Sequence, residues 1–202
     1  NAEASLAGTR LSPADGGNLN RAFLGAPARD ERVARLARGF GLARCLFFRG
    51  VETGSMPAAA SRLGVARLSA EIGGGAETSQ ELVRLCRDGM LSCLAGLDMV
   101  DAHHAMPGPL EAFHDVDAPR ASMRADAPGV FIPSVALGQQ VAAGQQVGTL
   151  CEPARPDRPP LTLASPQDGT VVCLRALARS DDGDCLLQIA PARPFETLST
   201  LY

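Results

Sequence analysis

The sequence predicts an α/β domain over residues 1–100, a linker over residues 101–124 and an all-β domain over residues 125–202. Three observations support this division. Short apolar runs alternate with helical patterns in the first region, proline and histidine interrupt the second, and a strand–turn pattern occurs twice in the third. A chain of 202 residues is long enough to bury a hydrophobic core without disulfides or a structural metal.

The composition excludes several classes of function. The formal net charge is -3, and all 19 basic residues are arginine. The absence of lysine excludes Schiff-base chemistry, P-loop phosphate binding and the attachment of biotin or lipoate. The sequence also has no basic cluster, no tryptophan, no signal-peptide pattern and no apolar run of membrane-spanning length. We therefore expect a soluble, cytoplasmic protein that binds neither nucleic acid nor membranes.

The cysteines are scattered along the chain. They form no C-x-x-C pair and lie among apolar residues, so we expect them to be buried and reduced. The six positions are Cys45, Cys86, Cys93, Cys151, Cys173 and Cys185.

The first region opens with a helix and a strand. Asp30 can cap a helix that ends at Gly39 and Gly41. Its apolar residues, at helical spacing, are Val33, Leu36, Ala37 and Phe40. The apolar run 45–48 then predicts a buried strand.

A second set of elements follows in the same order. Proline and glycine delimit a helix over residues 57–63, and residues 65–72 form a predicted strand that runs into three glycines. Thr78 and Glu81 form a capping box for a longer helix. The expected apolar stripe of that helix comprises Leu82, Leu85, Cys86, Cys93, Leu94 and Leu97.

The linker contains every histidine of the chain. His103 and His104 are adjacent, so on an extended segment their side chains point to opposite faces, and His114 lies ten residues further on. We expect all three to be exposed linker residues rather than ligands of one metal ion.

The third region contains an internal repeat. Residues 128–131 followed by 144–150 are echoed by residues 166–171 followed by 183–189. Each copy predicts strands separated by tight turns, for which glycine supplies the positive φ. Two interleaved copies resemble the barrel-sandwich hybrid of biotinyl and lipoyl domains, in fold only, because the carrier lysine is absent.

Two polar features are candidates for chemistry. The loop over residues 7–23 carries Arg10, Asn20 and Arg21, which suit either a solvated loop or a grip on a carboxylate and a carbonyl oxygen. Glu71 ends the predicted strand 65–72, where open α/β sheets place their ligands. It can act as a general base or simply bond to backbone or to an arginine.

The segment from Gly8 to Phe23 resembles the "GTR-x-SP-x-DG-x-NLNR-x-F" motif of the succinylglutamate desuccinylase/aspartoacylase family. These proteins are zinc deacylases related to the M14 carboxypeptidases, and the wording of the motif leans toward the N-acetyl-diaminobutyrate deacetylase branch. Glu71 resembles the "E-x-G" general base of the family. The resemblance implies a zinc-carboxypeptidase-like α/β/α domain, incomplete here, followed by the barrel-sandwich-like β domain.

The resemblance also implies roles for four residues. Arg10 would polarise the scissile carbonyl and stabilise the oxyanion, and Asn20 and Arg21 would hold the substrate carboxylate. Glu71 would move a proton from the attacking water to the leaving amine. A zinc ion is implied as cofactor and an N-acyl amino acid as substrate. We also expect a homo-oligomer.

The zinc ligands of the family are missing from this sequence. The family takes them from an "H-x-x-E" motif upstream and a "D-x-H" motif between the arginine–asparagine loop and the glutamate, whereas this chain has no histidine before His103. We expect that segments before Asn1 and near residues 28–32 are absent. The leading hypothesis is a zinc-dependent amidohydrolase. The alternative is a non-catalytic binding or assembly protein, a remnant of the same fold.

Overall fold

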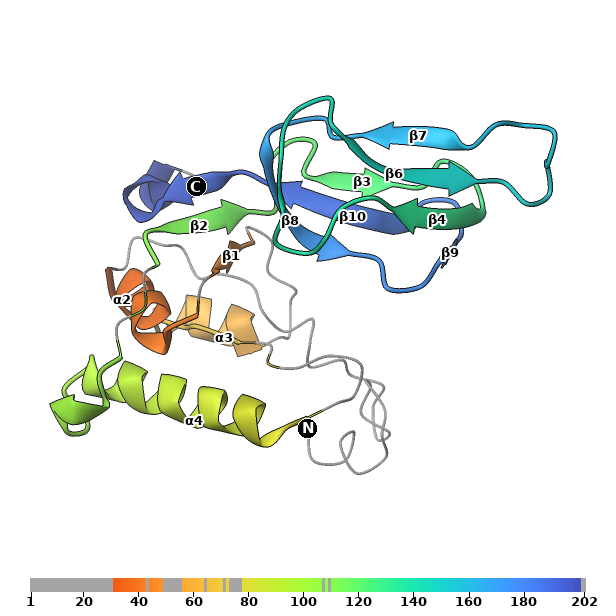
Figure 1. The fold of residues 1–202 in the computed structure, drawn as a ribbon. Helices are drawn as coiled ribbons and strands as arrows, with labels where there is room; N and C mark the ends of the chain where they lie inside the picture. The colour runs from red at the N-terminus through yellow and green to blue at the C-terminus, as the bar shows by residue number, and fades with distance from the viewer. Residues whose placement is uncertain are drawn as a thin grey trace. The chain divides into compact units, whose positions relative to one another are not determined.

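The computed structural model describes residues 31–42, 44–48, 56–63, 65–70, 72, 78–106, 108 and 110–200 (Figure 1). These residues fall into two compact units. Unit 2 comprises Ala112–Arg193, and unit 1 comprises the described residues up to Glu111 and from Pro194 onward. Helices dominate unit 1 and strands dominate unit 2, which gives the mixed α/β composition that the sequence predicts. Within the described ranges, no helix is both long and apolar enough to span a bilayer.

The described part of unit 1 contains three α-helices and few strand residues. They are α2 (Glu31–Phe40), α3 (Met56–Arg62) and α4 (Gln80–Ala95), with strand β1 (Leu46–Phe47) and the short 3₁₀ helices η2 (Ala102–His104) and η3 (Phe195–Thr200). The helices confirm the sequence prediction to within about one residue where the structure describes them, which excludes Asp30. The predicted strand over 65–72 is wrong, because residues 65–70 and 72 have no strand pairing. That segment has one β-branched residue between 65 and 70 and therefore little intrinsic preference for a strand.

The N-terminus of α4 differs from the prediction by one residue. Ser79, rather than Thr78, is the N-cap: its backbone is extended, with φ -143° and ψ 162°, and its side chain accepts a hydrogen bond from the backbone N–H of Leu82 at 3.2 Å. That bond satisfies one of the N–H groups that the first turn leaves without a partner.

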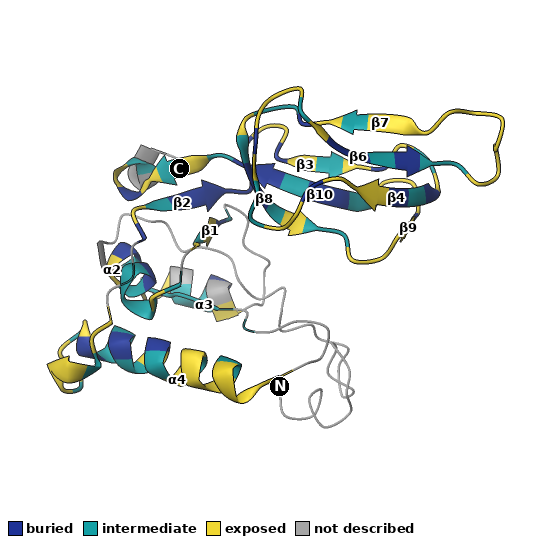
Figure 2. Ribbon diagram, in the orientation of Figure 1, coloured by how far each residue is buried: buried dark blue, intermediate teal, exposed yellow. Residues whose placement is uncertain are grey.

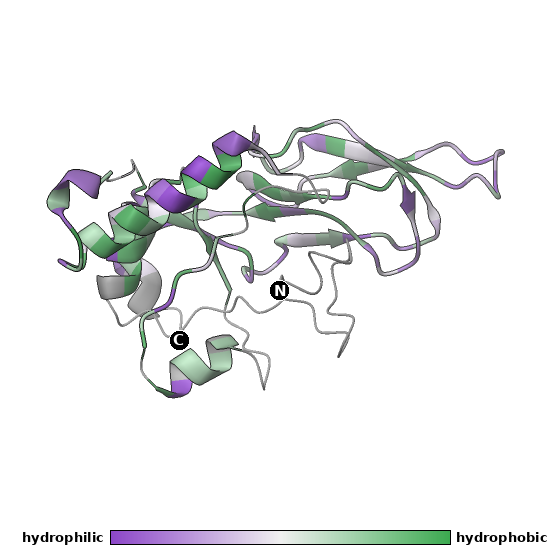
Figure 3. Ribbon diagram, turned by 90° about the horizontal axis from the view of Figure 1, so that it is seen from below, coloured by the Kyte–Doolittle hydropathy of each residue, from purple (hydrophilic) through white to green (hydrophobic). Residues whose placement is uncertain are grey.

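Small residues on α4 face α2, which corrects the predicted apolar stripe. Gly89, Ser92 and Ala95 are buried, whereas Leu85 is 40% exposed. The Cys93 thiol donates to the Leu36 carbonyl at 3.3 Å, so the two helices approach closely. Hydrophobic and hydrophilic residues alternate along α4, as the green and purple bands of Figure 3 show.

The end of the chain returns to α2. The guanidinium of Arg38 lies 4.9 Å from the centre of the Phe195 ring and 3.9 Å from the Glu196 carboxylate. Its Nε also donates to the Leu110 carbonyl at 3.3 Å. Arg38 therefore joins three parts of unit 1 that are far apart in the sequence.

Unit 2 consists of two four-stranded sheets and a strand pair. The sheet orders are β3-β10-β8-β5 and β7-β6-β4-β9, and β2 pairs with β11. The bounds are β2 (Ala112–Asp115), β3 (Ser122–Arg124), β4 (Gly129–Pro133), β5 (Gln140–Val141), β6 (Gln146–Cys151), β7 (Leu161–Ala164), β8 (Gly169–Leu174), β9 (Arg179–Ser180), β10 (Cys185–Ala190) and β11 (Ala192–Pro194).

Both sheets contribute to one core. Phe131, Val147 and Leu150 come from the β7-β6-β4-β9 sheet, and Leu186 and Leu187 come from the other sheet. These side chains are 0–2% exposed, and the dark blue stretches of Figure 2 mark their strands. Burying that apolar surface is the main stabilising term for unit 2.

The two copies of the repeat have matching turns. Gly144 and Gly183 both have φ of +81°, a conformation that strains residues with a Cβ. In each turn, the side chain of the residue after the glycine accepts a hydrogen bond from the backbone N–H three residues earlier. Gln145 accepts from Ala142 at 3.1 Å, and Asp184 accepts from Asp181 at 2.8 Å. The predicted strand–turn repeat is thus present in the structure.

Part of the expected linker is folded into unit 2. Strands β2 and β3 lie between residues 112 and 124, and β3 pairs with β10 in the register Cys185↔Arg124 and Gln188↔Ser122. The expectation that His114 is an exposed linker residue is wrong, because it lies in β2 and is 8% exposed. Proline and glycine around β2 and β3 favour a linker prediction, and the strands that pair with them lie far along the sequence.

Candidate functional site

The four residues predicted to carry the chemistry lie outside the described residues. They are Arg10, Asn20, Arg21 and Glu71. The structure therefore neither brings these residues together nor separates them. What it describes are the residues next to Glu71 in the sequence, the three histidines and the polar groups of unit 2.

A half-buried arginine lies four positions before Glu71. The Arg67 Nη1 donates to the Ser69 hydroxyl at 2.7 Å, so alternate side chains of this extended segment share a face. Burial lowers the pKa of the Arg67 guanidinium. A partly desolvated guanidinium beside a hydroxyl binds carboxylates well. Arg67 was not predicted as a site residue, although its two-residue spacing from Ser69 is visible in the sequence.

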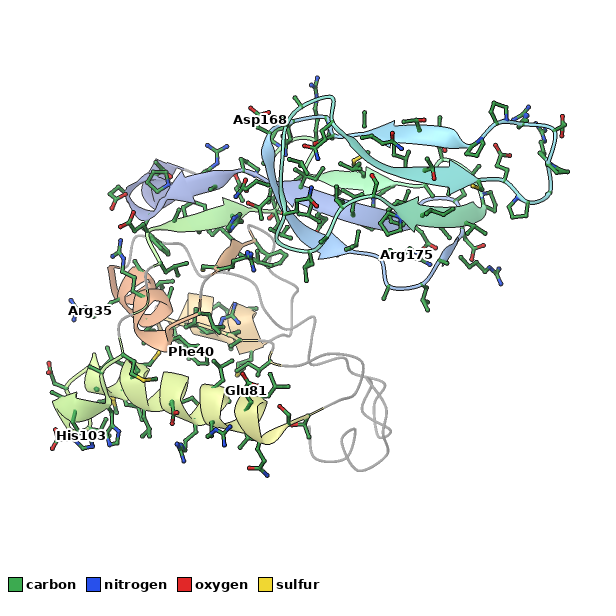
Figure 4. All side chains as sticks on the ribbon, viewed as in Figure 1. Arg35, Phe40, Glu81, His103, Asp168 and Arg175 are labelled. Atoms are coloured by element: carbon green, nitrogen blue, oxygen red, sulfur yellow. The ribbon has the colours of Figure 1, made fainter. Side chains whose placement is uncertain are left out.

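The histidines do not converge on one point. His103 lies in η2, where its Nδ1 is 3.0 Å from the Asp101 carboxylate and its ring centre is 3.9 Å from that of His104 (Figure 4). A hydrogen bond from the backbone N–H of His103 is the main cause that lowers the pKa of Asp101, and the His103 side chain adds to it. His103 is exposed, as expected, whereas His104 is half-buried; both belong to unit 1, and His114 belongs to unit 2.

His114 takes part in a buried polar network. Its Nε2 lies 3.0 Å from the Thr170 hydroxyl oxygen, and the Gln140 amide donates to that same oxygen at 2.9 Å. The Thr170 hydroxyl oxygen thus lies within hydrogen-bond distance of both the imidazole and the amide. The role of His114 in this network is accordingly structural.

Next to His114, a buried carboxylate pairs with an arginine. Asp115 is 0% exposed, and its Oδ2 accepts from the Arg193 Nε at 3.1 Å. The backbone N–H of Asp115 donates to the Pro191 carbonyl at 3.0 Å. The pair thereby ties β2 to the segment that enters β11.

A metal site is not found in the described part of the chain. Among those residues, no group of three or more histidine, cysteine, aspartate or glutamate side chains is placed to hold a metal ion. The structure describes every histidine of the sequence: His103 contacts Asp101 and His104 in unit 1, whereas His114 contacts Thr170 in unit 2. The described residues therefore do not fit the zinc ion that the resemblance implies.

The cysteines are reduced but less buried than expected. All six are free thiols; Cys173 is exposed and the other five are partly buried. Burial raises the pKa of the Cys45 thiol to about 11. The prediction that all six thiols are buried is therefore wrong, because several of these residues lie on strand faces that point toward solvent.

One curated relative matches nearly the whole chain. It is the N-alpha-acetyl-L-2,4-diaminobutyric acid deacetylase of Halomonas elongata, 22% identical across 94% of this chain and 70% of its own length. The match spans 238 residues, whereas 94% of this chain is about 190 residues. About 48 positions of that match thus have no counterpart in this chain. No family model matches the sequence.

Solved structures share the fold. The succinylglutamate desuccinylase/aspartoacylase from Rhodobacter sphaeroides has a TM-score of 0.72 at 20% identity, and the match covers 95% of this chain and 72% of that one. The product-bound ectoine utilization protein EutE (DoeB) from Ruegeria pomeroyi has a TM-score of 0.73 at 19% identity, with the same coverage. In sequence and in fold, the chain thus resembles the succinylglutamate desuccinylase/aspartoacylase family, as the Gly8–Phe23 motif predicts.

Proposed function

We propose that this chain carries the substrate-binding and general-base part of an amidohydrolase that cleaves the amide bond of an N-acyl amino acid. The observation that carries the proposal is the match to a diaminobutyric acid deacetylase over 94% of the chain, which includes most of the region that holds Glu71 and the arginine–asparagine loop. An N-acetylated amino acid presents the two groups that this loop suits, a carboxylate and a carbonyl oxygen.

Each of the four residues has one task in the proposed reaction. Asn20 and Arg21 hold the substrate carboxylate, which fixes the position of the amide. Arg10 donates to the carbonyl oxygen and stabilises the negative charge that develops on it. Glu71 accepts a proton from the attacking water and delivers it to the nitrogen of the departing amine. The proposed products are a free carboxylic acid and a free amino acid.

Arg67 is a further candidate for the substrate carboxylate. Its guanidinium is partly desolvated and its position is four residues before Glu71 in the sequence. A charge-assisted hydrogen bond to a carboxylate gains strength as water is excluded. We assign it a supporting role in binding rather than in the proton transfer.

Zinc enters this proposal through the family resemblance. Zinc in such hydrolases activates water and polarises carbonyls. Since the described residues do not fit a zinc ion, we propose that the ligands belong to segments that the relatives possess and this chain lacks. The positions of the Halomonas relative without a counterpart here support that view. No step of the reaction above is assigned to the metal.

A non-catalytic role is the second candidate. The absence of a group of metal-ligating side chains from the described residues favours it. In that case the chain would be a binding or assembly protein that retains the fold. We further propose that unit 2 is a barrel-sandwich hybrid that serves a homo-oligomer, and that the protein works in the cytoplasm.

Zinc content and hydrolysis together test the two candidates. We would determine the intact mass and the zinc content of the purified protein, then measure release of free amine from N-acetyl-diaminobutyrate. Glu71→Gln should reduce turnover by about 10²–10⁴-fold, while the matched control Glu81→Gln, on the exposed side of α4, should retain it. A mass near 21.0 kDa without zinc or turnover would establish the non-catalytic alternative. Equal turnover of the wild type and Glu71→Gln would refute the role of Glu71.

A further inference from the structure

Helix α4 has two chemically different sides. Its buried residues, Gly89, Ser92 and Ala95, lie on the side that packs against α2 and η2 (Figure 1). At 3.6 residues per turn, Val83 and Met90 project from the opposite side of the helix. Both of these apolar side chains are 55% exposed. The side of α4 that faces away from α2 is therefore apolar and accessible.

An apolar row follows this accessible side along the whole helix. The row, at alternating spacings of four and three residues, comprises Val83, Arg87, Met90, Leu94 and Leu97. The exception to its apolar character is Arg87, whose Nη2 pairs with the neighbouring Asp88 carboxylate at 2.7 Å. Leu97 follows the end of α4, and its N–H donates to the Leu94 carbonyl at 3.2 Å, so it continues the last turn. Alternating spacings of four and three are typical of the seam between two paired helices.

Charges beside this seam are arranged for antiparallel pairing. A second row, each member one residue after a seam position, comprises Arg84, Leu91 and Asp98 at intervals of seven. Arg84 and Asp98 are exposed, and Leu91 is half-buried. When two copies of the row run in opposite directions, Arg84 of each copy lies level with Asp98 of the other. A parallel pair would instead bring like charges level with each other.

The backbone at Asp98 adds a second reason to expect an external cation. Its φ is +57°, a left-handed conformation for which glycine is favoured, and its N–H donates to the Ala95 carbonyl at 3.0 Å. The helix dipole also opposes a carboxylate at this end of a helix. An arginine from an antiparallel helix, with the N-terminal half of that helix alongside, offsets this electrostatic cost.

We propose that the accessible side of α4 is a self-association surface, on which a second copy of the chain packs its own α4 in antiparallel orientation. Val83 of each copy packs against Leu97 of the other, and the two Met90 side chains meet at the two-fold axis. Arg84 of each copy pairs with Asp98 of the other. Apolar burial supplies the affinity, and the ion pairs set the orientation.

This inference rests on α4 alone. It is separate from the amide hydrolysis and from the role of unit 2 proposed above, because the experiments below measure association and contact rather than turnover. Failure of the α4 surface and failure of the proposed function are therefore distinguishable.

Sedimentation equilibrium of the full chain tests for the dimer. Over about 1–200 μM, the wild type should pass from monomer to dimer as the concentration rises. Met90→Asp places two carboxylates at the axis and should raise the Kd by about 100-fold or more, since the symmetry applies the change twice. Met56→Asp, at a similarly exposed methionine of α3, is the matched control and should leave the Kd unchanged. Circular dichroism of both variants checks that they are folded.

A cross-link tests the antiparallel register. The chain has no lysine, so Arg84→Lys introduces its only side-chain amine, which a carbodiimide joins to a carboxylate in direct contact. Positions 84 and 98 of one chain are about 21 Å apart along the helix axis, since each residue rises about 1.5 Å. An amide between them can therefore form only between copies. Peptide mapping should find this amide in a species of twice the monomer mass. Arg35→Lys, at an exposed position of α2, is the control and should not link to Asp98.

An exchange of charges completes the test. Arg84→Asp and Asp98→Arg should each raise the Kd by about tenfold or more, because like charges then face each other. An equimolar mixture of the two variants should restore association, since each acidic side chain then faces a basic one. The proposal is overturned if the wild type stays monomeric over this range, or if Met90→Asp leaves the Kd unchanged. It is also overturned if the amine of Arg84→Lys links to a carboxylate other than Asp98, or if the mixture associates no better than either variant alone.

Discussion

The contact between Gly89 of α4 and Phe40 of α2 makes a sharp prediction about unit 1. A Cβ added at Gly89 would lie 2.8 Å from the Phe40 Cε1 and 2.9 Å from Cδ1 and Cζ. Alanine is favoured over glycine inside a helix by about 1 kcal/mol, but overpacking of this kind costs about 1–3 kcal/mol. Gly89→Ala should therefore destabilise the α2–α4 pair by up to about 2 kcal/mol, despite its better helix propensity.

Gly96 provides a matched control at the end of the same helix. Its φ is -65°, which alanine adopts freely, and a Cβ there would lie 3.5 Å from the nearest atoms, an ordinary contact. Gly96→Ala should be neutral or stabilise α4 by up to about 1 kcal/mol. Hydrogen exchange measured by mass spectrometry on peptides of α4 reports the free energy of opening for each variant.

A double mutant separates the clash from the propensity. In a Phe40→Ala background the ring is gone, so Gly89→Ala should become stabilising by about 1 kcal/mol. If Gly89→Ala protects α4 as well as Gly96→Ala does in the wild-type background, the steric reasoning is refuted.

Three further predictions concern other parts of the chain. Arg193→Met removes the ion pair of the buried Asp115 carboxylate and should lower the free energy of unfolding by about 2–3 kcal/mol, measured by urea unfolding followed by circular dichroism. This is less than for a wholly buried pair, because the Arg193 side chain is 39% exposed. A decrease below about 0.5 kcal/mol would contradict the reasoning. Ser79→Ala should cost about 1 kcal/mol and speed exchange in the first turn of α4, whereas Ser79→Asp should not. Since the folded pKa of Asp101 is lowered, its contribution to η2 is complete above the ordinary value of 3.8 and disappears as the pH falls through the lower folded value. An NMR titration of the His103 amide should show that acid transition, and Asp101→Asn should abolish it.

The helices were predictable from the sequence because their signals are local. Proline and glycine delimit α3, and the predicted cap marks the start of α4, each to within about one residue. The strand predicted over 65–72 failed because a strand exists only when partners pair with it. Conversely, β3 was missed because its partner β10 lies about 60 residues further along the chain. A local pattern cannot reveal pairing over that distance.

The same distinction between local and distant signals applies to the candidate site. The roles of Arg10 and Glu71 were predicted from motifs, which record chemistry at fixed spacing. The network of His114 with Thr170 depends on a contact between distant strands, which no spacing in the sequence reveals. The prediction for His114 failed for that reason: its surroundings are built by residues 56 positions away.

Because η3 belongs to unit 1, this unit can complete its contacts only after the end of the chain has been synthesised. Arg38 meets Phe195 and Glu196, which are made about 157 residues later, after all of unit 2. At about 5–20 residues per second, roughly 8–30 s pass before α2 can acquire these last contacts. Unit 2 does not share this delay, because β2 and β11 are both within reach once Arg193 has been made. Unit 2, which lies between the two segments of unit 1 in the sequence, can thus fold before η3 has been synthesised, whereas unit 1 can complete its contacts only afterwards.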